Sequence, residues 1–330
     1  MDTFDKDLLN EIQWSFPLSS RPYHELAGRL GADVGEVMER VRRLKAAGII
    51  RQLSAIFDTR RLGYKSSLVA MSVAPDRLVQ VAASISEHPG VSHNYERNHD
   101  FNLWFTIAVP PHSSIQDEVN RFSRLEGVSA TRMLPTLRMF KIGVKLDMNE
   151  SKKREVKPSE DKKKIRDEPF ANTERDRSFV RELQKDLPVV ERPFAQMAQN
   201  LGVAEEDLFR QAREYEATGV MRRYAAILRH RDAGFLANGM IVWKVPDDMI
   251  PSIGEMLGAF PQVSHCYQRP AYPDWPYTVF SMIHCRTREE AAETARTIQS
   301  QIGISEYRIL FSEREFKKSR VEYFMEPAAA

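Results

Sequence analysis

Apolar residues recur with a helical period through the first fifty residues of the chain. The apolar positions of three successive segments are Leu8, Leu9 and Ile12, then Leu26, Ala27 and Leu30, then Val34, Val37, Val41 and Leu44. Gly31 separates the second segment from the third, and Gly48 follows the last one, where glycine commonly ends a helix. Three short helices with a tight turn before the last predict a helix-turn-helix.

After residue 60 the pattern changes to short apolar stretches that are typical of strands. The predicted strands are 66–73, 91–97, 102–109 and part of 130–144, and the predicted helices are 76–88 and 114–125. The order strand-helix-strand-strand-helix-strand is that of a ferredoxin-like sandwich. The same order runs from a strand at 239–245 to a strand at 306–316, so the chain predicts two such domains.

The whole arrangement occurs twice. Gly48 recurs as Gly219, which is 171 positions later, and His93 recurs as His265, which is 172 positions later. A register that stays constant over so many residues indicates an internal duplication.

The predicted fold is therefore α+β, with two tandem units that each have a helix-turn-helix domain followed by a ferredoxin-like βαββαβ domain. We expect the first unit to divide into 1–48 and 49–148, and the second into 175–219 and 220–330. Residues 149–174 between them are mostly charged, have little to bury and predict a linker.

The composition excludes several classes of protein. Of the 330 residues 42% are hydrophobic and 28% charged, as in a globular protein, and no apolar run approaches the roughly 20 residues of a membrane helix. The N-terminal sequence MDTFDKDLL lacks the pattern of a signal peptide, so we expect a cytoplasmic protein without a membrane partner. Cys266 and Cys285 fit no common zinc motif, so we expect buried free thiols and predict no metal site.

The predicted helix-turn-helix elements raise the question of DNA binding. A recognition helix contacts phosphates, so it should carry net positive charge and polar readers near its start. The first candidate, 33–45, has three acidic residues ahead of all its basic ones, and the second, 204–219, has five acidic residues against two arginines. The formal net charge of the chain is only +2. We therefore expect no DNA partner and interpret both helices as scaffold.

One phrase combines unusual side chains and recurs: GVSHNYER at 90–97 and QVSHCYQR at 262–269. Because alternate residues of a strand share a face, four positions of each copy are expected to line up. They are Val91, His93, Tyr95 and Arg97, and then Val263, His265, Tyr267 and Arg269. Core filling explains the valines and tyrosines, and duplication copies core and site residues alike. An arginine beside histidine is costly to bury without an anionic partner, which favours an anion-binding site.

The second half adds a basic stretch, RRYAAILRHR at 222–231, with tryptophan, tyrosine and phenylalanine residues following it. Its basic members are Arg222, Arg223, Arg229, His230 and Arg231. Guanidinium groups and apolar faces together suit a flat aromatic ligand that carries several carboxylates. A basic strand at an exposed sheet edge, protected against aggregation, explains the stretch equally well.

These motifs resemble the Lrp/AsnC family of transcriptional regulators, in which a helix-turn-helix precedes a ferredoxin-like domain. Within that family, VSHNYERNHDFNLWFT resembles one subunit of the siroheme decarboxylases. ILRHRDAGF at 227–235, together with VSHCYQRPAYPDWPYTVFSMIH at 263–284, resembles the other subunit. The resemblance covers nearly the whole chain except the linker, and it implies that both subunit types are fused. Two other functions stay open: a ligand-responsive transcriptional regulator, and a haem carrier or sensor that releases its ligand unchanged.

The resemblance implies a reaction as well. Siroheme decarboxylases remove carbon dioxide from the acetate side chains at C12 and C18 of siroheme and give 12,18-didecarboxysiroheme, for haem d1 synthesis or the siroheme-dependent route to haem. No organic cofactor is implied, and iron enters as part of the tetrapyrrole substrate. The two halves are expected to pair within the chain, with the site in the cleft between their sheets, and a homodimer is compatible with such proteins.

Histidine suits the delivery of a proton as carbon dioxide leaves, because its pKa lies near working pH. We predict His230 and His265 as proton donors, followed by His93 and His99. Any of the four could instead ligate the substrate iron or be a hydrogen-bonded core residue. The predicted substrate-binding residues are Tyr95, Arg97, Arg222, Arg223, Arg229, Arg231, Tyr267, Arg269, Trp275 and His284.

Overall fold

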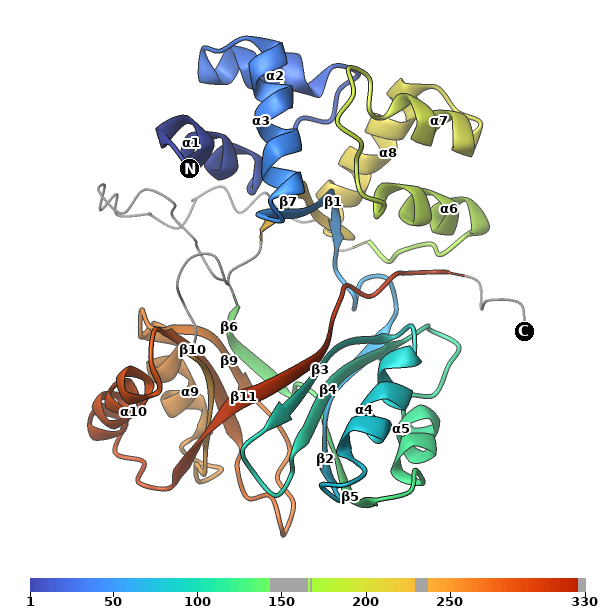
Figure 1. The fold of residues 1–330 in the computed structure, drawn as a ribbon. Coiled ribbons are helices and arrows are strands. Elements are labelled where there is room, and N and C mark those ends of the chain that lie inside the picture. The colour runs from blue at the N-terminus through green and yellow to red at the C-terminus, as the bar shows by residue number, and fades with distance from the viewer. Residues whose placement is uncertain (143–165, 167, 229–236, 326–330) are drawn as a thin grey trace. The chain divides into compact units, whose positions relative to one another are not determined.

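The computed structural model describes residues 1–142, 166, 168–228 and 237–325. The chain divides into two compact units (Figure 1). The helical unit contains residues 1–64, 146–229 and 322–330, and the sheet unit contains residues 65–145 and 230–321. No helix in the described ranges is long and apolar enough to cross a membrane.

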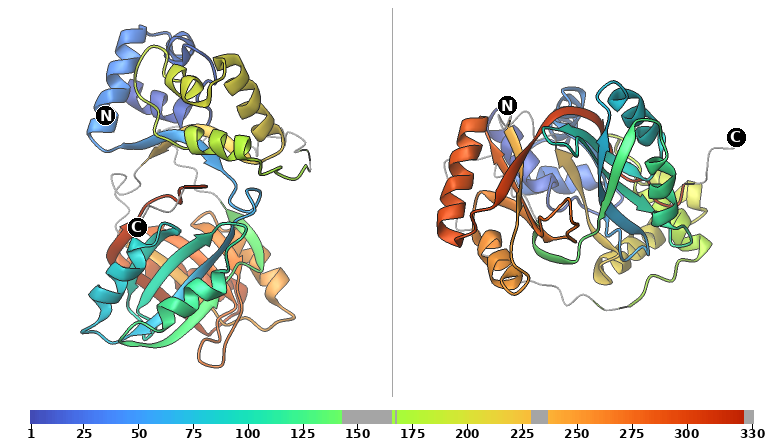
Figure 2. Two further views of the ribbon diagram at one scale, coloured as in Figure 1. Left: turned by 90° about the vertical axis from the view of Figure 1, so that its right-hand side faces the viewer. Right: turned by 90° about the horizontal axis from the view of Figure 1, so that it is seen from below.

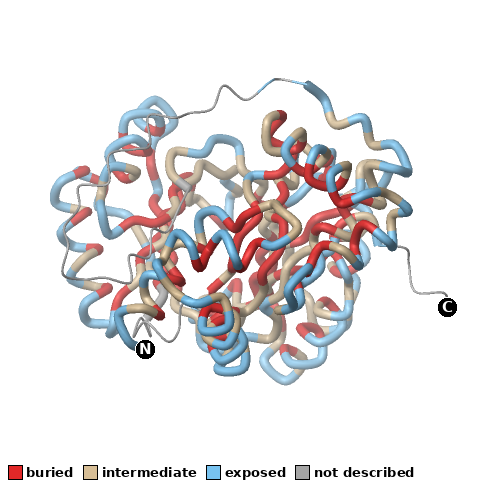
Figure 3. The backbone as a smooth tube through the Cα atoms, turned by 90° about the horizontal axis from the view of Figure 1, so that it is seen from above, coloured by how far each residue is buried: buried red, intermediate tan, exposed pale blue. Residues whose placement is uncertain are grey.

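The helical unit holds the two predicted helix-turn-helix modules. The helices of the first module are α1 (Thr3–Ile12), α2 (Pro22–Leu30) and α3 (Val34–Ala46), and those of the second are α6 (Glu174–Leu183), α7 (Ala195–Leu201) and α8 (Glu205–Ala217). Their backbones alternate between buried and exposed positions (Figure 3), as expected for helices that pack on one side. Gly31 and Gly202 end α2 and α7 with φ values of 64° and 66°, a left-handed conformation that glycine adopts without steric cost.

A two-stranded antiparallel sheet joins the two modules. It consists of β1 (Ile50–Phe57) and β7 (Met221–Leu228), and its residues Leu53, Tyr224 and Ala225 are fully or almost fully buried. The segment that follows α6 adds a backbone contact, because the amide of Leu187 donates to the carbonyl of Leu53 at 2.8 Å. We expected both strands to belong to the ferredoxin-like domains, which were to begin at residues 49 and 220. The compact units instead place them with the helices, since among the described strands they pair only with each other.

Over its described residues, the sheet unit contains one nine-stranded sheet and four helices. Its elements from the first half of the chain are β2 (Lys65–Val73), α4 (Leu78–Glu87), β3 (Val91–Arg97), β4 (Leu103–Val109), α5 (Ile115–Ser123), β5 (Val128–Leu134) and β6 (Arg138–Ile142). Those from the second half are β8 (Ala237–Trp243), α9 (Ile250–Ala259), β9 (Val263–Gln268), β10 (Val279–Cys285), α10 (Arg288–Ile302) and β11 (Tyr307–Lys318). Each half has the predicted order of elements.

The strand order shows that the halves are ferredoxin-like and that they exchange strands. Along the sheet the order is β5-β2-β4-β3-β11-β8-β10-β9-β6, so each half contributes four adjacent strands with its last strand beside its first. The far end of β11 crosses over and pairs with β3 of the first half. In return β6, which continues the last strand of the first half, pairs with β9 of the second half. The two halves are therefore joined by main-chain hydrogen bonds at two places in this unit.

Three apolar cores hold the sheet unit together. Helices α4 and α5 cover one core of the first half, and α9 and α10 cover the equivalent core of the second half, on the outer sides of the sheets (Figure 2). The opposite faces of the strands meet in a third core that includes Trp104, Leu134, Phe280 and Trp275. The prediction of buried free cysteines is confirmed, since Cys266 and Cys285 both lie in the core beneath α9 and α10.

Candidate active site

The repeated phrase lies on β3 and β9, and the same β-bulge interrupts both copies. In the first copy Val91 pairs with Ile107 and His93 with Thr106, so Ser92 is an extra residue in the ladder. In the second copy Val263 pairs with Ile283 and His265 with Met282, so Ser264 is the extra residue. Bulges re-aim side chains and are common beside active sites.

The bulges correct the prediction that four alternate residues share a face. Val91 and Val263 are fully buried in the cores under the helices. The extra serine shifts the alternation by one residue, so the following histidine and tyrosine lie on the opposite face of the sheet. Each histidine and its tyrosine keep the same geometry in both copies, with ring centroids 6.1 Å apart and planes at 31°.

The bulge serines hold the histidines. The hydroxyl of Ser92 lies 2.9 Å from Nδ1 of His93, and that of Ser264 lies 2.9 Å from Nδ1 of His265. Ser264 also lies 2.8 Å from Nε2 of His284, so one hydroxyl joins two imidazoles in the second copy. Sequence reasoning missed both serines. The available signal was that serine precedes histidine in both copies of the phrase.

The repeated arginines join the two halves. The Nη1 group of Arg97 donates to the carbonyl of Leu310 at 2.8 Å, and Arg269 donates to the carbonyl of Leu134 in the same way. Burial lowers the pKa of each guanidinium to about 10, and the Nε of each has no hydrogen-bond partner among the described residues. We predicted that these arginines hold substrate carboxylates. Both are buried against carbonyls of the other half, so neither arginine is among the proposed substrate contacts.

Two further predicted residues lie in or beside the core between the sheets. Trp275 is fully buried, with its ring 5.1 Å from Trp104 and 5.2 Å from His99 by ring centroids. His99 lies in the turn after β3, at the opposite end of that strand from His93, and its Nδ1 accepts from the amide of Phe101 at 3.0 Å. Burial lowers the pKa of His99, which favours the neutral imidazole. The structure therefore does not bring His99 together with His93.

The basic stretch 222–231 is described only as far as residue 228. Arg222 and Arg223 lie on β7 in the helical unit, where Arg222 pairs with Asp58 at 2.8 Å. Arg223 stacks on the ring of Trp14 at 5.2 Å, and burial lowers its pKa. Both were predicted to bind substrate, and they lie on another sheet than the repeated phrase. Arg229, His230 and Arg231 lie outside the described residues.

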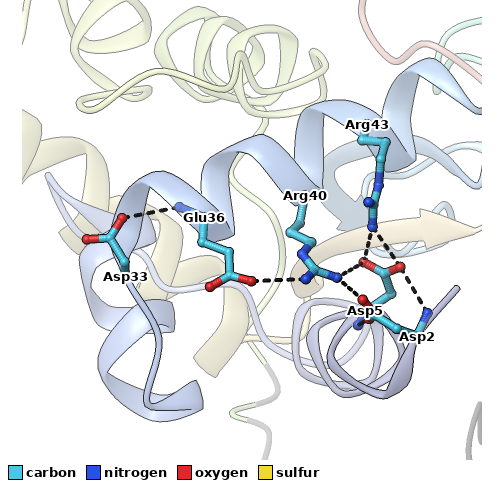
Figure 4. Close-up of polar contacts among 6 residues, drawn as sticks. All are labelled: Asp2, Asp5, Asp33, Glu36, Arg40 and Arg43. Carbon is cyan, nitrogen blue, oxygen red and sulfur yellow. Dashed lines mark hydrogen bonds and ion pairs between the residues drawn. The ribbon is translucent and has the colours of Figure 1, made fainter.

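Basic residues on the predicted recognition helix α3 are engaged within the helical unit (Figure 4). Arg40 binds Asp5 at 3.1 Å and Glu36 at 3.0 Å, and it also pairs with Asp2. Arg43 contacts both carboxylate oxygens of Asp5, at 2.7 and 2.8 Å.

The other two basic residues of α3 reach the second module. Lys45 pairs with Asp186 at 2.8 Å, and Arg42 donates to the carbonyl of Val189 at 3.0 Å. The helix therefore holds its basic side chains against its own protein.

Known proteins match this chain over both helix-turn-helix modules and both ferredoxin-like halves. A family described as the siroheme decarboxylase NirDL-like HTH domain matches residues 5–51 and 176–222, and the AsnC-like ligand binding domain matches 61–141 and 232–317. A siroheme decarboxylase from Hydrogenobacter thermophilus is 42% identical over 98% of this chain and 95% of its own length. A crystal structure of the siroheme decarboxylase NirDL is similar with a TM-score of 0.77 and 37% identity, covering 98% of this chain and 95% of that one. The same likeness holds for a structure of NirDL in co-complex with an iron-uroporphyrin III analogue.

Other relatives correspond to half of the chain. A siroheme decarboxylase beta subunit from Methanosarcina barkeri is 41% identical over 44% of this chain and 96% of its own length. An alpha subunit from Desulfovibrio desulfuricans is 44% identical over 45% of this chain and 86% of its own length. Together with the full-length matches and the duplicated fold, these findings show that the chain belongs to the siroheme decarboxylase family and joins two subunit-like halves in one polypeptide.

Proposed function

We propose that this chain decarboxylates siroheme, converting the acetate side chains at C12 and C18 into methyl groups and giving 12,18-didecarboxysiroheme. The observation that carries the proposal is the 42% identity to a siroheme decarboxylase over 98% of the chain. The solved relative with an iron-uroporphyrin III analogue supports a tetrapyrrole as the ligand. In keeping with the resemblance, the product would enter haem d1 synthesis or the siroheme-dependent route to haem.

The chemistry needs one proton for each acetate. Cleavage of the bond between the methylene carbon and the carboxylate releases carbon dioxide and leaves the bonding electron pair on the methylene carbon. A proton delivered to that carbon forms the methyl group, so one acetate and one proton give one methyl group and one carbon dioxide. An acid held close to the methylene carbon lowers the barrier, because it neutralises the charge as it develops.

His265 is our first candidate for that acid. The hydroxyl of Ser264 fixes the imidazole from its Nδ1 side, and we assign the proton transfer to the other ring nitrogen, Nε2. Through the same hydroxyl His284 can exchange a proton with this group, since it lies 2.8 Å from Ser264. The partly buried ring of Tyr267 lies beside His265 as a surface for the macrocycle. His93, Ser92 and Tyr95 form the equivalent set in the first half.

His230 remains a predicted second acid, and Arg229 and Arg231 remain predicted partners of the substrate carboxylates. These three residues have no described position. His99 and Trp275 take no part in the proposed site, because Trp275 belongs to the core between the sheets and the half-buried ring of His99 packs against it.

We further propose that the helix-turn-helix modules do not bind DNA. All four basic residues of α3, namely Arg40, Arg42, Arg43 and Lys45, contact acidic side chains or carbonyls of the protein itself. A basic side chain that is already paired with a carboxylate must give up this partner before it can neutralise a phosphate, which weakens the electrostatic part of DNA binding. The first turn of α8 contains Glu205, Glu206 and Asp207, which would face phosphate with negative charge.

Anaerobic incubation with siroheme tests the proposed activity. We expect the purified chain to convert siroheme into a pigment lighter by two molecules of carbon dioxide, as measured by mass spectrometry, with equivalent release of gas. His265→Ala should slow this conversion by on the order of a hundredfold, in the range that a general acid contributes. Siroheme that is bound but recovered unchanged would identify a carrier or a ligand-responsive regulator instead.

A further inference from the structure

The duplication creates two candidate surfaces for a single kind of ligand. The histidine and the tyrosine of each surface come from the repeated phrase, and an exchanged strand from the other half lies alongside. In the first surface, β11 runs beside β3 and places Glu315 directly opposite Tyr95. In the second surface, β6 runs beside β9 and places Met139 directly opposite Tyr267.

The exchanged strands have kept their structure in both copies. Each has a bulge after the residue that faces the tyrosine, at Phe140 in β6 and at Phe316 in β11. An arginine stacks on each of these rings, with Arg138 at 4.9 Å from Phe140 and Arg314 at 5.6 Å from Phe316.

The lysine that follows each bulge has also been kept. Lys141 donates to the carbonyl of Phe260 at 2.8 Å, and Lys317 donates to the carbonyl of Ser86 at 2.6 Å. The two exchanged strands therefore share a bulge, an arginine and a lysine. They differ at the residue opposite the tyrosine, which is Glu315 in β11 and Met139 in β6.

That difference changes which ligand each surface accepts. Met139 is 47% exposed, so an apolar, polarisable side chain faces outward beside His265 and Tyr267. Glu315 is exposed and places a carboxylate beside Tyr95, with Lys318 in register with His93. A macrocycle laid on the first surface would cover that carboxylate and bring its own carboxylates near it, which costs desolvation and repulsion.

The second surface also has the additional imidazole. Ser264 bonds His265 and His284, whereas the position in the first half that corresponds to His284 is Ala108, 176 residues earlier. The two histidines that can supply protons and the apolar side chain of Met139 thus belong to the same surface, the second one.

We infer that each chain binds one siroheme, on the surface formed by His265, Tyr267 and Met139, and that Glu315 excludes the substrate from the equivalent surface of the first half. The inference rests on the proposed function, because the charge and shape of siroheme are what distinguish the two surfaces. It makes Met139 a specificity-determining residue, although this residue has no part in the proton transfer.

An anaerobic titration of the full-length chain with siroheme, followed by absorbance, tests the inference. We expect one equivalent of siroheme per chain for the wild type. Met139→Glu should weaken binding at least tenfold, which corresponds to about 1.4 kcal/mol, because it recreates the charge found at Glu315. Met139→Leu should bind like the wild type, and Met139→Gln should lose less than the Glu variant, which separates charge from contact. Glu315→Gln removes the charge that excludes siroheme from the first surface, so it should raise the stoichiometry towards two equivalents per chain. A stoichiometry that stays at one in this variant would remove Glu315 from the inference.

Thermal unfolding measurements check that each variant is folded. Because Met139 is exposed, we expect its substitution to disturb the fold little. Two equal sites per wild-type chain, or unchanged binding in folded Met139→Glu, would overturn the inference while carbon dioxide release still upheld the proposed function. Conversely, one equivalent that Met139→Glu abolishes, without any release of carbon dioxide by the wild type, would retain the binding surface and reject the enzyme.

Discussion

At the scale of single residues, the two bulge serines decide what the repeated phrase can do. A regular strand would keep His93 and His265 on the same face as the buried valines, under the helices. One extra residue in each ladder moves the imidazole to the other face, and the hydroxyl of that residue then binds its Nδ1. One extra serine thus determines both the sheet face on which the histidine lies and the hydrogen bond that its Nδ1 makes.

We expect Ser264→Ala to lower kcat on the order of tenfold, which is about 1.4 kcal/mol and close to the net value of one or two hydrogen bonds. The pH profile of kcat should shift as well, because the variant unlinks His265 from His284. Ser264→Thr keeps the hydroxyl and should recover most of the activity. Ser92→Ala should change kcat less, since among the described residues Ser92 bonds one imidazole whereas Ser264 bonds two. Full activity in folded Ser264→Ala would remove the serine from the mechanism.

At the scale of elements, α3 has the position of a recognition helix, but its basic side chains contact the protein itself. Its N-terminal Asp33 caps the helix by accepting from the amide of Glu36 (Figure 4) and from that of Gly35. Its basic side chains are held by Asp2 and Asp5 of α1 and by the second module. The same contacts that stabilise the unit therefore neutralise the surface that would contact phosphate.

For DNA we expect wild-type binding no tighter than the non-specific range of about 10⁻⁴–10⁻⁶ M at physiological salt, measured by fluorescence anisotropy with a mixed-sequence duplex. A triple variant, Asp2→Asn, Asp5→Asn and Glu36→Gln, releases Arg40 and Arg43 from their carboxylates. It should bind more tightly at low salt, with a steeper dependence on salt concentration. Tight, salt-dependent binding by the wild type would contradict our account of α3.

At the scale of the whole molecule, the two halves are held together by strands rather than by the linker. The pairs β1 with β7, β3 with β11, and β6 with β9 each join the first half to the second. Arg97 and Arg269 add a buried contact from each half to the last strand of the other. Relatives exist as separate alpha and beta subunits, which agrees with an interface that does not depend on a covalent connection.

Cutting the chain in the charged segment 149–174 should leave the two fragments associated. We expect a chain with an inserted protease site there to elute at the same volume before and after cleavage, and to retain carbon dioxide release within about a factor of two. The uncleaved chain with the same insertion is the control. Fragments that separate without denaturant would show that the strand pairs are too weak to replace the linker.

Much of the architecture was predictable from the sequence, because periodicity and repetition are local properties. Helical spacing and left-handed glycines such as Gly31 and Gly202 identify the helix-turn-helix modules, and the order of the apolar stretches identifies the ferredoxin-like halves. The family resemblance in the repeated phrase also predicted the family to which the comparisons assign the chain. These features depend on neighbours along the chain, so they can be read without coordinates.

Only the tertiary structure decided which of the candidate residues meet. The bulges at Ser92 and Ser264, the burial of Arg97, Arg269 and Trp275, and the pairing of Met139 with Tyr267 all depend on the register between strands that are distant in sequence. A shift of one residue in register reverses the face of every following side chain, and no local pattern specifies that shift. The sequence by itself therefore determined the family and the repeated framework, whereas long-range strand pairing determined which side chains share a surface.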